Sequence, residues 1–333
     1  MKRIIITVCA VFSFTFLFAS SVVEKKDNNL ITVYAYDSFC GQYGPGAELC
    51  SKFTDTTGIR VNLVSCGNAG EMINRITSEG DNCKADVIIG LPDSVEVDKS
   101  LFYSFEPKCS ENLIPYDPQT NLVPFDYGIL AFLYNTESGF PFIPRSLNDL
   151  TAPEYRNAVL LIDPRNSSVG LGTLMWTVDA LGQDQAVKWW QSMKQNALTI
   201  TDSWSMAYGL FTEGEAPFVV SYTTSPVYHM IYEGNCHYMP LEFSDGHIRI
   251  VEYMGISAFS EKKENAVLFC NYILTEGQNK IATDNSMFPA NTNTVLDSAF
   301  DAALQTENIL NIDTQLSEQE IDSYIKSWTD AMI

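Results

Sequence analysis

Hydrophobic residues follow two alternating spacings in the first part of the chain. Short runs dominated by apolar and β-branched residues, typical of strands, occupy 30–35, 59–64 and 85–91. Between them, 45–57 and 71–78 carry apolar residues at the three-to-four-residue spacing of helices. This alternation of strand and helix predicts an α/β fold built on a mainly parallel sheet.

The same alternation resumes after residue 122 and continues to the end of the chain. The further strands that it predicts lie at 129–134, 158–162, 217–220 and 253–258. The further helices that it predicts lie at 170–180, 185–194, 205–211, 263–275 and 317–332. Because late segments continue the set that the early segments began, we expect the chain to cross between two lobes more than once.

The lobe boundaries follow from these crossings. We assign 28–124 and 253–288 to lobe 1, and 127–250 and 292–333 to lobe 2, with a ligand cleft between the lobes. The crossing segments are expected near 124–127, 250–253 and 288–291. Short crossing segments of this kind act as hinges when two lobes close on a ligand.

The N-terminal residues 1–21 have the layout of a secretory signal peptide. Lys2 and Arg3 precede an apolar segment at 4–18, and small residues follow at 19–21, where we expect cleavage. The apolar segment is too short to be read as a spanning helix. We therefore expect an exported, soluble protein. We also expect a periplasmic location and a monomer.

The charge of the chain is strongly acidic. It has 20 basic and 41 acidic side chains, and removal of Lys2 and Arg3 with the signal peptide takes the formal charge from −21 to −23. Such a surface argues against nucleic acid or an anionic membrane as a partner. It suits a cationic ligand.

Cysteine and histidine usage gives little support to a metal site. The seven cysteines after the signal peptide form no C-x-x-C pair, which argues against zinc and thioredoxin-like chemistry. In an oxidising compartment we expect some of them to form disulfides, and the odd number leaves at least one thiol free. They are Cys40, Cys50, Cys66, Cys83, Cys109, Cys236 and Cys270.

Aromatic and hydroxyl side chains are concentrated where two predicted strands end. The run 221–229 follows a buried strand and holds Tyr222 and Tyr228, four further hydroxyl residues and a proline. Tyr36 lies at the end of the first strand, and the carboxyl ends of strands are where open α/β sheets bind ligands. These rings can stack on a small aromatic ligand. The alternative for both segments is a turn with packed tyrosines.

Ser167 and Ser168 lie between a predicted strand and a predicted helix. The free N–H groups and the dipole at the start of a helix form a natural site for an anion. Serine is also a common helix cap, and the two roles are compatible. The segment has no lysine of the kind that a phosphate-binding Walker loop requires.

Several motifs, in this order along the chain, together resemble the thiamine-binding periplasmic proteins of bacterial ABC importers, members of the type II periplasmic-binding-protein family. They are the segments 33–39, 44–46, 85–91, 123–128, 163–172, 204–211, 221–229 and 243–247. The resemblance implies a two-lobed Venus-flytrap fold in which each lobe is a mainly parallel sheet flanked by helices. It also implies a binding protein rather than an enzyme. Such a protein captures thiamine, thiamine monophosphate or thiamine diphosphate and hands it to a permease with its ATPase subunit, and it needs no cofactor.

The resemblance also implies roles for individual residues. Tyr36 and Tyr228 would flank the aminopyrimidine ring, with Trp204 and Tyr222 beside the ligand. Ser167 and Ser168 would lie at the phosphate end. From the residues themselves, Asp37 and Asp126 are candidate counterions for the thiazolium, although capping or pairing with an arginine explains them equally well.

Three positions depart from the family pattern. Tyr43 replaces a tryptophan and keeps an aromatic face. Asn68 and Ala69 replace an acidic residue and a glycine, which removes a negative charge from the site. Ser286 replaces a second tryptophan and loses a large ring. These changes leave open which phosphorylation state the protein prefers.

Two alternatives remain from the sequence. Thiamine-degrading transferases share this fold and use a cysteine nucleophile, for which Cys66 is the first candidate and Cys40 the second. Related two-lobed proteins bind polyamines or ferric iron instead. Polyamine sites need several carboxylates around aromatic rings, and iron sites commonly pair adjacent tyrosines, which Tyr222 and Tyr228 are not.

Overall fold

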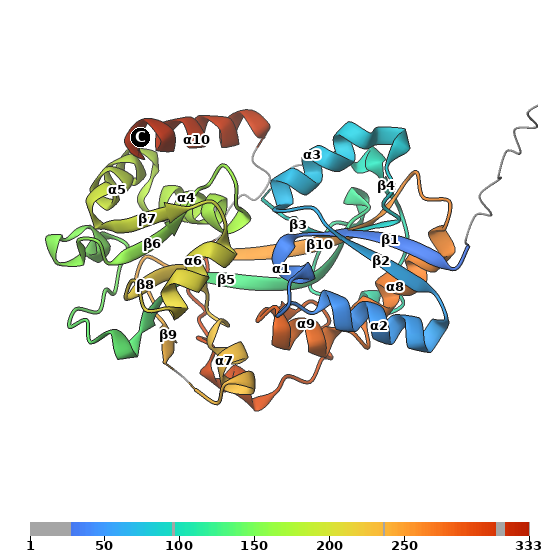
Figure 1. Ribbon diagram of the computed structural model, residues 1–333. Helices are drawn as coiled ribbons and strands as arrows, with labels where there is room; N and C mark the ends of the chain where they lie inside the picture. Colours follow the sequence, from blue (N-terminus) through green and yellow to red (C-terminus); the bar gives the residue numbers. More distant parts are fainter. Residues whose placement is uncertain (1–27, 95–96, 236, 311–316, 333) are drawn as a thin grey trace, which may run out of the picture.

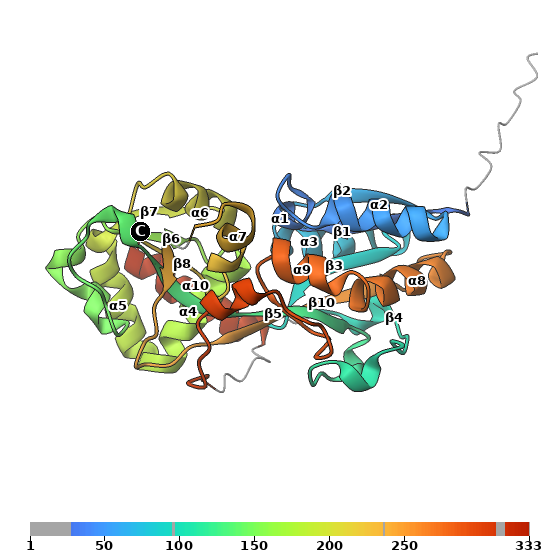
Figure 2. The same cartoon turned by 90° about the horizontal axis from the view of Figure 1, so that it is seen from below.

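The computed structural model describes residues 28–94, 97–235, 237–310 and 317–332. The predicted signal peptide lies outside this part of the chain. Within it, no helix combines the length and the apolar character needed to cross a membrane. Figure 1 and Figure 2 show two lobes side by side, with the strands β5 and β10 running across between them.

The strands of the described residues form one continuous set of hydrogen-bonded neighbours. They are β1 (Leu30–Ala35), β2 (Arg60–Ser65), β3 (Val87–Pro92), β4 (Phe102–Tyr103), β5 (Val123–Asn135), β6 (Val159–Ile162), β7 (Ala197–Thr201), β8 (Phe218–Tyr222), β9 (Tyr238–Pro240), β10 (Arg249–Ser257) and β11 (Phe288–Pro289). The helices are α1 (Asp37–Cys40), α2 (Gly46–Thr57), α3 (Ala69–Glu79), α4 (Ser168–Leu181), α5 (Gln183–Asn196), α6 (Trp204–Thr212), α7 (Pro226–Tyr232), α8 (Lys263–Leu274), α9 (Gln278–Asp284) and α10 (Glu318–Met332).

The two lobes repeat one sheet plan. In lobe 1, β2, β1 and β3 are parallel neighbours, and β10 joins β3 in the antiparallel sense. In lobe 2, β7, β6 and β8 are parallel neighbours, and β5 joins β8 in the antiparallel sense. The predicted two-lobed α/β fold with mainly parallel sheets is confirmed. Each crossing strand is the antiparallel member because it enters its sheet from the other lobe.

The crossing strand β5 is longer than the sequence predicted. Its first part, from Val123 to Ile129, pairs with β10, and its second part, from Leu130 to Tyr134, pairs with β8. The sequence predicted a strand only over 129–134, but the structure has one strand of 13 residues that also includes Pro124 and Gly128. The short strand β11 also pairs with β5. Of the three segments expected to cross between the lobes, β5 is thus the direct neighbour of both others.

The sheet of lobe 1 is covered on both faces. Helix α3 lies on one face, where Met72 and Ile76 pack against Tyr34 and Ile88. Helices α2 and α8 lie on the other face, where the rings of Phe53 and Phe269 meet edge to face at 5.0 Å. The core of lobe 1 is therefore built mainly from aliphatic and phenylalanine side chains, with cysteine and tyrosine among them.

The core of lobe 2 contains buried tryptophans. Trp189 and Trp190 on α5 are both buried, and their rings meet edge to face at 4.9 Å. Trp328 on α10 meets the ring of Trp190 at 6.1 Å. Burial of a large apolar side chain stabilises the fold by about 1.5–3 kcal/mol. The C-terminal helix is thereby held in lobe 2, at the top of Figure 1.

The expectation of disulfides is wrong for every cysteine that the structure describes. Six are free thiols: Cys40, Cys50, Cys66, Cys83, Cys109 and Cys270. Cys50, Cys109 and Cys270 pack in the lobe 1 core as small hydrophobic side chains, and Cys66 packs beneath α3. An oxidising compartment does not by itself place two thiols at the distance that a disulfide requires. Cys236 lies outside the described residues.

Candidate functional site

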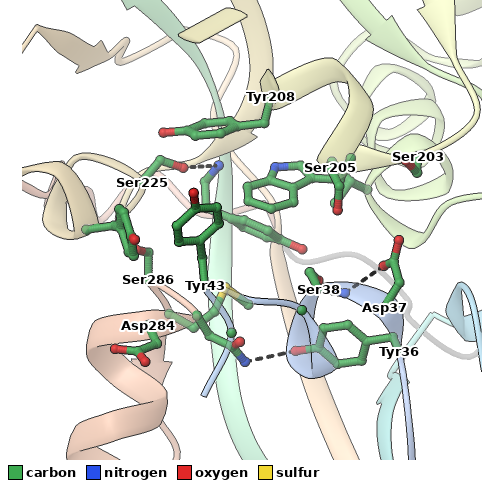
Figure 3. A pocket seen from close by; sticks show the side chains of 18 of the residues that line it. Tyr36, Asp37, Ser38, Tyr43, Ser203, Ser205, Tyr208, Ser225, Asp284 and Ser286 are labelled. Carbon is green, nitrogen blue, oxygen red and sulfur yellow. Dashed lines mark hydrogen bonds between the residues drawn. The ribbon is translucent and has the colours of Figure 1, made fainter. Parts of the chain in front are cut away.

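A cavity of ≈ 730 Å³ lies between the two lobes. Its size is that of a site for a small molecule. Figure 3 shows Tyr36 and Asp284 on one side of the cavity and Tyr208 and Ser225 on the other. All ten residues expected to contact a ligand line it: Tyr36, Tyr43, Asn68, Ala69, Ser167, Ser168, Trp204, Tyr222, Tyr228 and Ser286. Their contact with a ligand stays a prediction.

Tyr36 follows the last residue of β1 and is held from two directions. Its ring lies against the backbone of Gly90, where an added Cβ would come within 2.0 Å of Tyr36 Cδ1. Gly90 also has a φ of +100°, which disfavours any other residue. Asn285 Nδ2 donates a hydrogen bond of 2.8 Å to the Tyr36 hydroxyl, the dashed line that ends on this residue in Figure 3.

Two tyrosines from opposite lobes meet at the mouth of the cavity. Tyr43 lies in the loop before α2 and is 69% exposed. Its ring approaches the ring of Tyr228, on α7 of lobe 2, edge to face at 6.3 Å. Since this contact joins the two lobes, any change in the width of the cleft alters it.

Aromatic side chains of lobe 2 form the wall opposite Tyr36. Trp204, the first residue of α6, stacks on Tyr208 with ring centres 4.8 Å apart. Its indole Nε1 donates a hydrogen bond of 2.8 Å to Ser221 Oγ. Tyr222 is buried at the end of β8, where its ring lies over Gly128. The rings are therefore fixed in place and available for stacking on a flat ligand.

Ser167 and Ser168 form what we call the serine wall, at the N-terminus of α4. Ser167 caps the helix, and its Oγ accepts a hydrogen bond of 3.4 Å from the Gly170 amide. The first turn of α4 contains no acidic residue. Helix N-termini without a carboxylate favour negative charge. The serine wall can thus receive an anion in addition to capping its helix.

Asn68 has a different role in its own helix. Its side chain accepts a hydrogen bond of 2.9 Å from the Glu71 amide, and the Glu71 carboxylate accepts one from the Asn68 amide. This reciprocal capping box fixes the start of α3 beside the cavity. Ala69, the first residue of α3, presents only a methyl group there.

Two carboxylates, Asp126 and Glu252, form what we call the acidic floor. Asp126 is 0% exposed and Glu252 is 8% exposed, and they are cross-strand partners on β5 and β10. Glu252 lines the cavity, whereas Asp126 lies behind it. Within the described residues, neither forms an ion pair with a lysine or an arginine. Burial raises the pKa of both carboxyl groups, and the charge of Glu252 raises that of Asp126 further.

The positions of Asp37 and Asp126, the candidate counterions from the sequence, only partly support that role. Asp37 lines the cavity, but its Oδ1 accepts a hydrogen bond of 2.7 Å from the Ser38 amide. Asp126 reaches the cavity only through Glu252. We missed Glu252 in the sequence, where the available signal was an acidic residue inside an otherwise apolar strand.

A second group of polar residues was also missed. The Tyr208 hydroxyl and His229 Nε2 are 2.9 Å apart, and His229 Nδ1 lies 2.7 Å from Glu233 Oε2. All three residues line the cavity. The sequence does not reveal this group, because a lone histidine gives no indication of its partners.

Comparisons with known proteins identify the family of this chain. The model of a family described as "Bacterial extracellular solute-binding protein" matches residues 96–313. The chain belongs to this family. The chain is 35% identical over 295 residues to a thiamine-binding periplasmic protein of Brucella abortus biovar 1, covering 87% of each chain. It is 33% identical over 308 residues to a protein of the same name from Escherichia coli K12, covering 91% of this chain and 93% of the relative.

A solved structure extends the comparison to the fold. The structure of a "Periplasmic thiamin binding protein" matches this one with a TM-score of 0.83 and 33% identity, covering 91% of this chain and 96% of that one. The fold is therefore that of the periplasmic binding proteins, and the resemblance read from the sequence is confirmed.

The chain is a binding protein rather than an enzyme. Its relatives carry the names of binding proteins. The two cysteines considered as nucleophiles, Cys66 and Cys40, do not line the cavity. Burial raises the pKa of both thiols, that of Cys40 to about 12, which disfavours the thiolate that a nucleophile requires.

Proposed function

We propose that this protein is the substrate-binding component of an ABC importer that captures thiamine and its phosphate esters in the periplasm. The observation that carries the proposal is one cavity lined by all ten residues that the thiamine-binding resemblance implies. Relatives named as thiamine-binding periplasmic proteins, similar over nearly the whole chain, support it. The delivery partners are the permease and the ATPase subunit of the importer, and the protein acts as a monomer.

The chemistry of the cavity fits a ligand with a flat ring and a positive charge. The aminopyrimidine of thiamine can stack between Tyr36 and Tyr228, with Trp204 and Tyr222 beside it. Stacking contributes about 0.5–1.5 kcal/mol beyond the area that it buries. The thiazolium is a permanent cation, and aromatic faces and the acidic floor both favour a cation. The serine wall suits the phosphate of the esters.

Lobe closure completes the proposed function. The lobes, 28–124 with 253–288 and 127–250 with 292–333, are proposed to rotate about the paired segments of β5, β10 and β11. These three segments are the hydrogen-bonded neighbours at the crossing. Ligand contacts from both lobes then hold the closed form, which the permease recognises.

Calorimetry with the mature chain tests the proposal. We expect thiamine and thiamine monophosphate to bind, and spermidine and ferric iron to bind far more weakly or not at all. The acidic floor is the feature that would suit a polyamine, so spermidine is the informative competitor. Tight binding of spermidine or ferric iron, with no heat from thiamine, would overturn the proposal.

A further inference from the structure

Two oxygen atoms of the acidic floor have no hydrogen-bond donor. They are Asp126 Oδ1 and Glu252 Oε2, and both are buried. The other oxygen of Asp126 accepts a hydrogen bond of 3.0 Å from Asn285 Nδ2. Glu252 interacts with the Tyr36 hydroxyl and with the carboxyl group of Asp126. Each unpartnered oxygen thus belongs to one member of a pair of buried carboxyl groups that lie opposite each other on β5 and β10.

Two ionised carboxylates cannot remain in this position without a counterion. A buried charge without a partner costs several kcal/mol, and a second like charge at contact adds to that cost. A single proton between Asp126 and Glu252 removes one charge and supplies the missing donor. Such a proton belongs to the pair rather than to either residue.

Among the described residues, the groups around the acidic floor supply no compensating cation. The phenols of Tyr36, after β1, and Tyr222, on β8, face it, and burial raises the pKa of both, so they stay neutral. Asp93, after β3, is a third carboxyl group nearby, and burial raises its pKa to about 7. Arg249, on β10, acts on Asp93 rather than on the floor. Glu252 lines the cavity, so a cationic ligand bound there can supply the positive charge.

We propose that Asp126 and Glu252 share one proton in the ligand-free protein and release it when a cationic ligand enters the cavity, so that the pair selects ligands by positive charge. The identity of the cation rests on the proposed function. On binding, the O–H bond of the shared carboxyl group breaks and the proton passes to solvent. The floor goes from one negative charge to two, and the ligand contributes one positive charge, so the total charge of the cavity is unchanged.

The exchange makes binding depend on pH. When the pair holds its proton, each binding event must release it, so the affinity falls about tenfold for each unit of pH below the upper pKa of the pair. When the pH is above that pKa, the proton has already left and the affinity no longer changes. Acidification therefore weakens the binding of a cation.

Calorimetry of wild-type protein with thiamine, in buffers of different ionisation enthalpy near neutral pH, counts the released protons. We expect close to one proton per thiamine in the wild type and none in Glu252→Gln or Asp126→Asn, because an amide supplies the missing donor permanently. Asp284→Asn is the matched control: this cavity residue already has Lys280 as its counterion, at 2.8 Å, so the proton count should stay at the wild-type value. Titration of thiamine into each buffer alone corrects for protons from the ligand.

Infrared spectroscopy of the ligand-free protein tests the shared proton without any ligand. We expect the C=O band of a buried, protonated carboxyl group in the wild type, and its loss in both amide variants. Absence of this band, or thiamine binding that releases no proton, overturns the inference, and neither measurement on the wild type depends on a variant that folds. If thiamine does not bind at all, the proposed function fails, while the infrared band still decides whether the floor holds the proton.

Discussion

The acidic floor and the serine wall line one cavity but favour opposite charges. The floor is built from two strands that cross between the lobes, and its carboxylates have no cation among the described residues. The serine wall is built on a helix N-terminus that has hydroxyl groups and free amides and no carboxylate in its first turn. A ligand with a cation at one end and an anion at the other satisfies both. The cavity can therefore discriminate between ligands by the placement of their charges as well as by ring stacking.

The largest expected effect comes from the rings that lie between the two charged ends. Tyr36→Ala and Tyr228→Ala should each weaken thiamine binding by about 1–3 kcal/mol, the scale of a lost stacking contact and its buried area. Titration calorimetry measures the loss. Tyr36→Phe is the matched control, because it keeps the ring and removes only the hydroxyl that accepts a hydrogen bond from Asn285. Wild-type affinity in both alanine variants would show that the rings are only structural.

The next largest effect is expected at the serine wall, where the loss of affinity should depend on whether the ligand carries a phosphate. Ser167→Ala should weaken the binding of thiamine monophosphate by about 1.5 kcal/mol or more, the scale of a hydrogen bond to a charged group, and that of thiamine by less. Four titrations, with two proteins and two ligands, make the comparison. Ser203→Ala is the control, since Ser203 also lines the cavity and caps a helix, α6, through the Met206 amide. Equal losses for both ligands in Ser167→Ala would mean that this serine only caps its helix.

The pH dependence of stability tests the floor in the absence of ligand. A carboxyl group whose pKa is raised on folding binds more protons in the folded state, so the stability that it contributes is lost as pH rises from its unfolded pKa to its folded pKa. Glu252→Gln should therefore raise the melting temperature above neutral pH, by about 2–4 °C for each kcal/mol gained. Below the unfolded pKa the variant should gain nothing.

Glu48→Gln provides the opposite case for the same melting experiment. Hydrogen bonds from Lys280 and Lys52 lower the pKa of Glu48 to about 2. Its contribution is present above its unfolded pKa and is lost on acidification. The amide should therefore not stabilise the protein at neutral pH. A gain in both variants would show that loss of net negative charge, rather than the floor, is responsible.

The smallest effect is expected at the mouth of the cavity. Tyr43 is 69% exposed and touches Tyr228 only by an edge-to-face contact. Tyr43→Ala should weaken thiamine binding by less than about 1 kcal/mol, because a solvated ring gains little from a stacking contact. Calorimetry beside Tyr36→Ala makes the comparison, and an equal loss in the two variants would place Tyr43 among the principal ligand contacts.

The sequence predicted most of the helices and strands because their signals are local. The spacing of apolar residues marks α2, α4 and α5, and Gly58 ends α2 in the left-handed conformation that a glycine there indicates. Six of the ten cavity residues lie within the motifs that carry the resemblance, and the other four, Tyr43, Asn68, Ala69 and Ser286, were expected as positions that depart from the family pattern. Their ligand contacts are still to be tested.

The acidic floor could not be found in this way because it depends on contacts between distant strands. Glu252 falls in a mostly apolar strand, and the sequence of that strand does not say which groups its carboxylate faces. Only the pairing of β10 with β5 places it opposite Asp126 and beneath the cavity. The disulfide expectation failed for a related reason, since compartment and composition carry no information on the distance between two thiols.

The order in which the chain is synthesised bears on how the two lobes fold. The core of lobe 1 includes Phe269 and Ile281, although its first strand begins at Leu30. The core of lobe 2 includes Trp328, which α10 contributes near the end of the chain. Neither core is complete until most of the chain has left the ribosome, and such distant contacts form slowly. A nascent chain of this topology therefore cannot complete either core while its C-terminal part is still being synthesised.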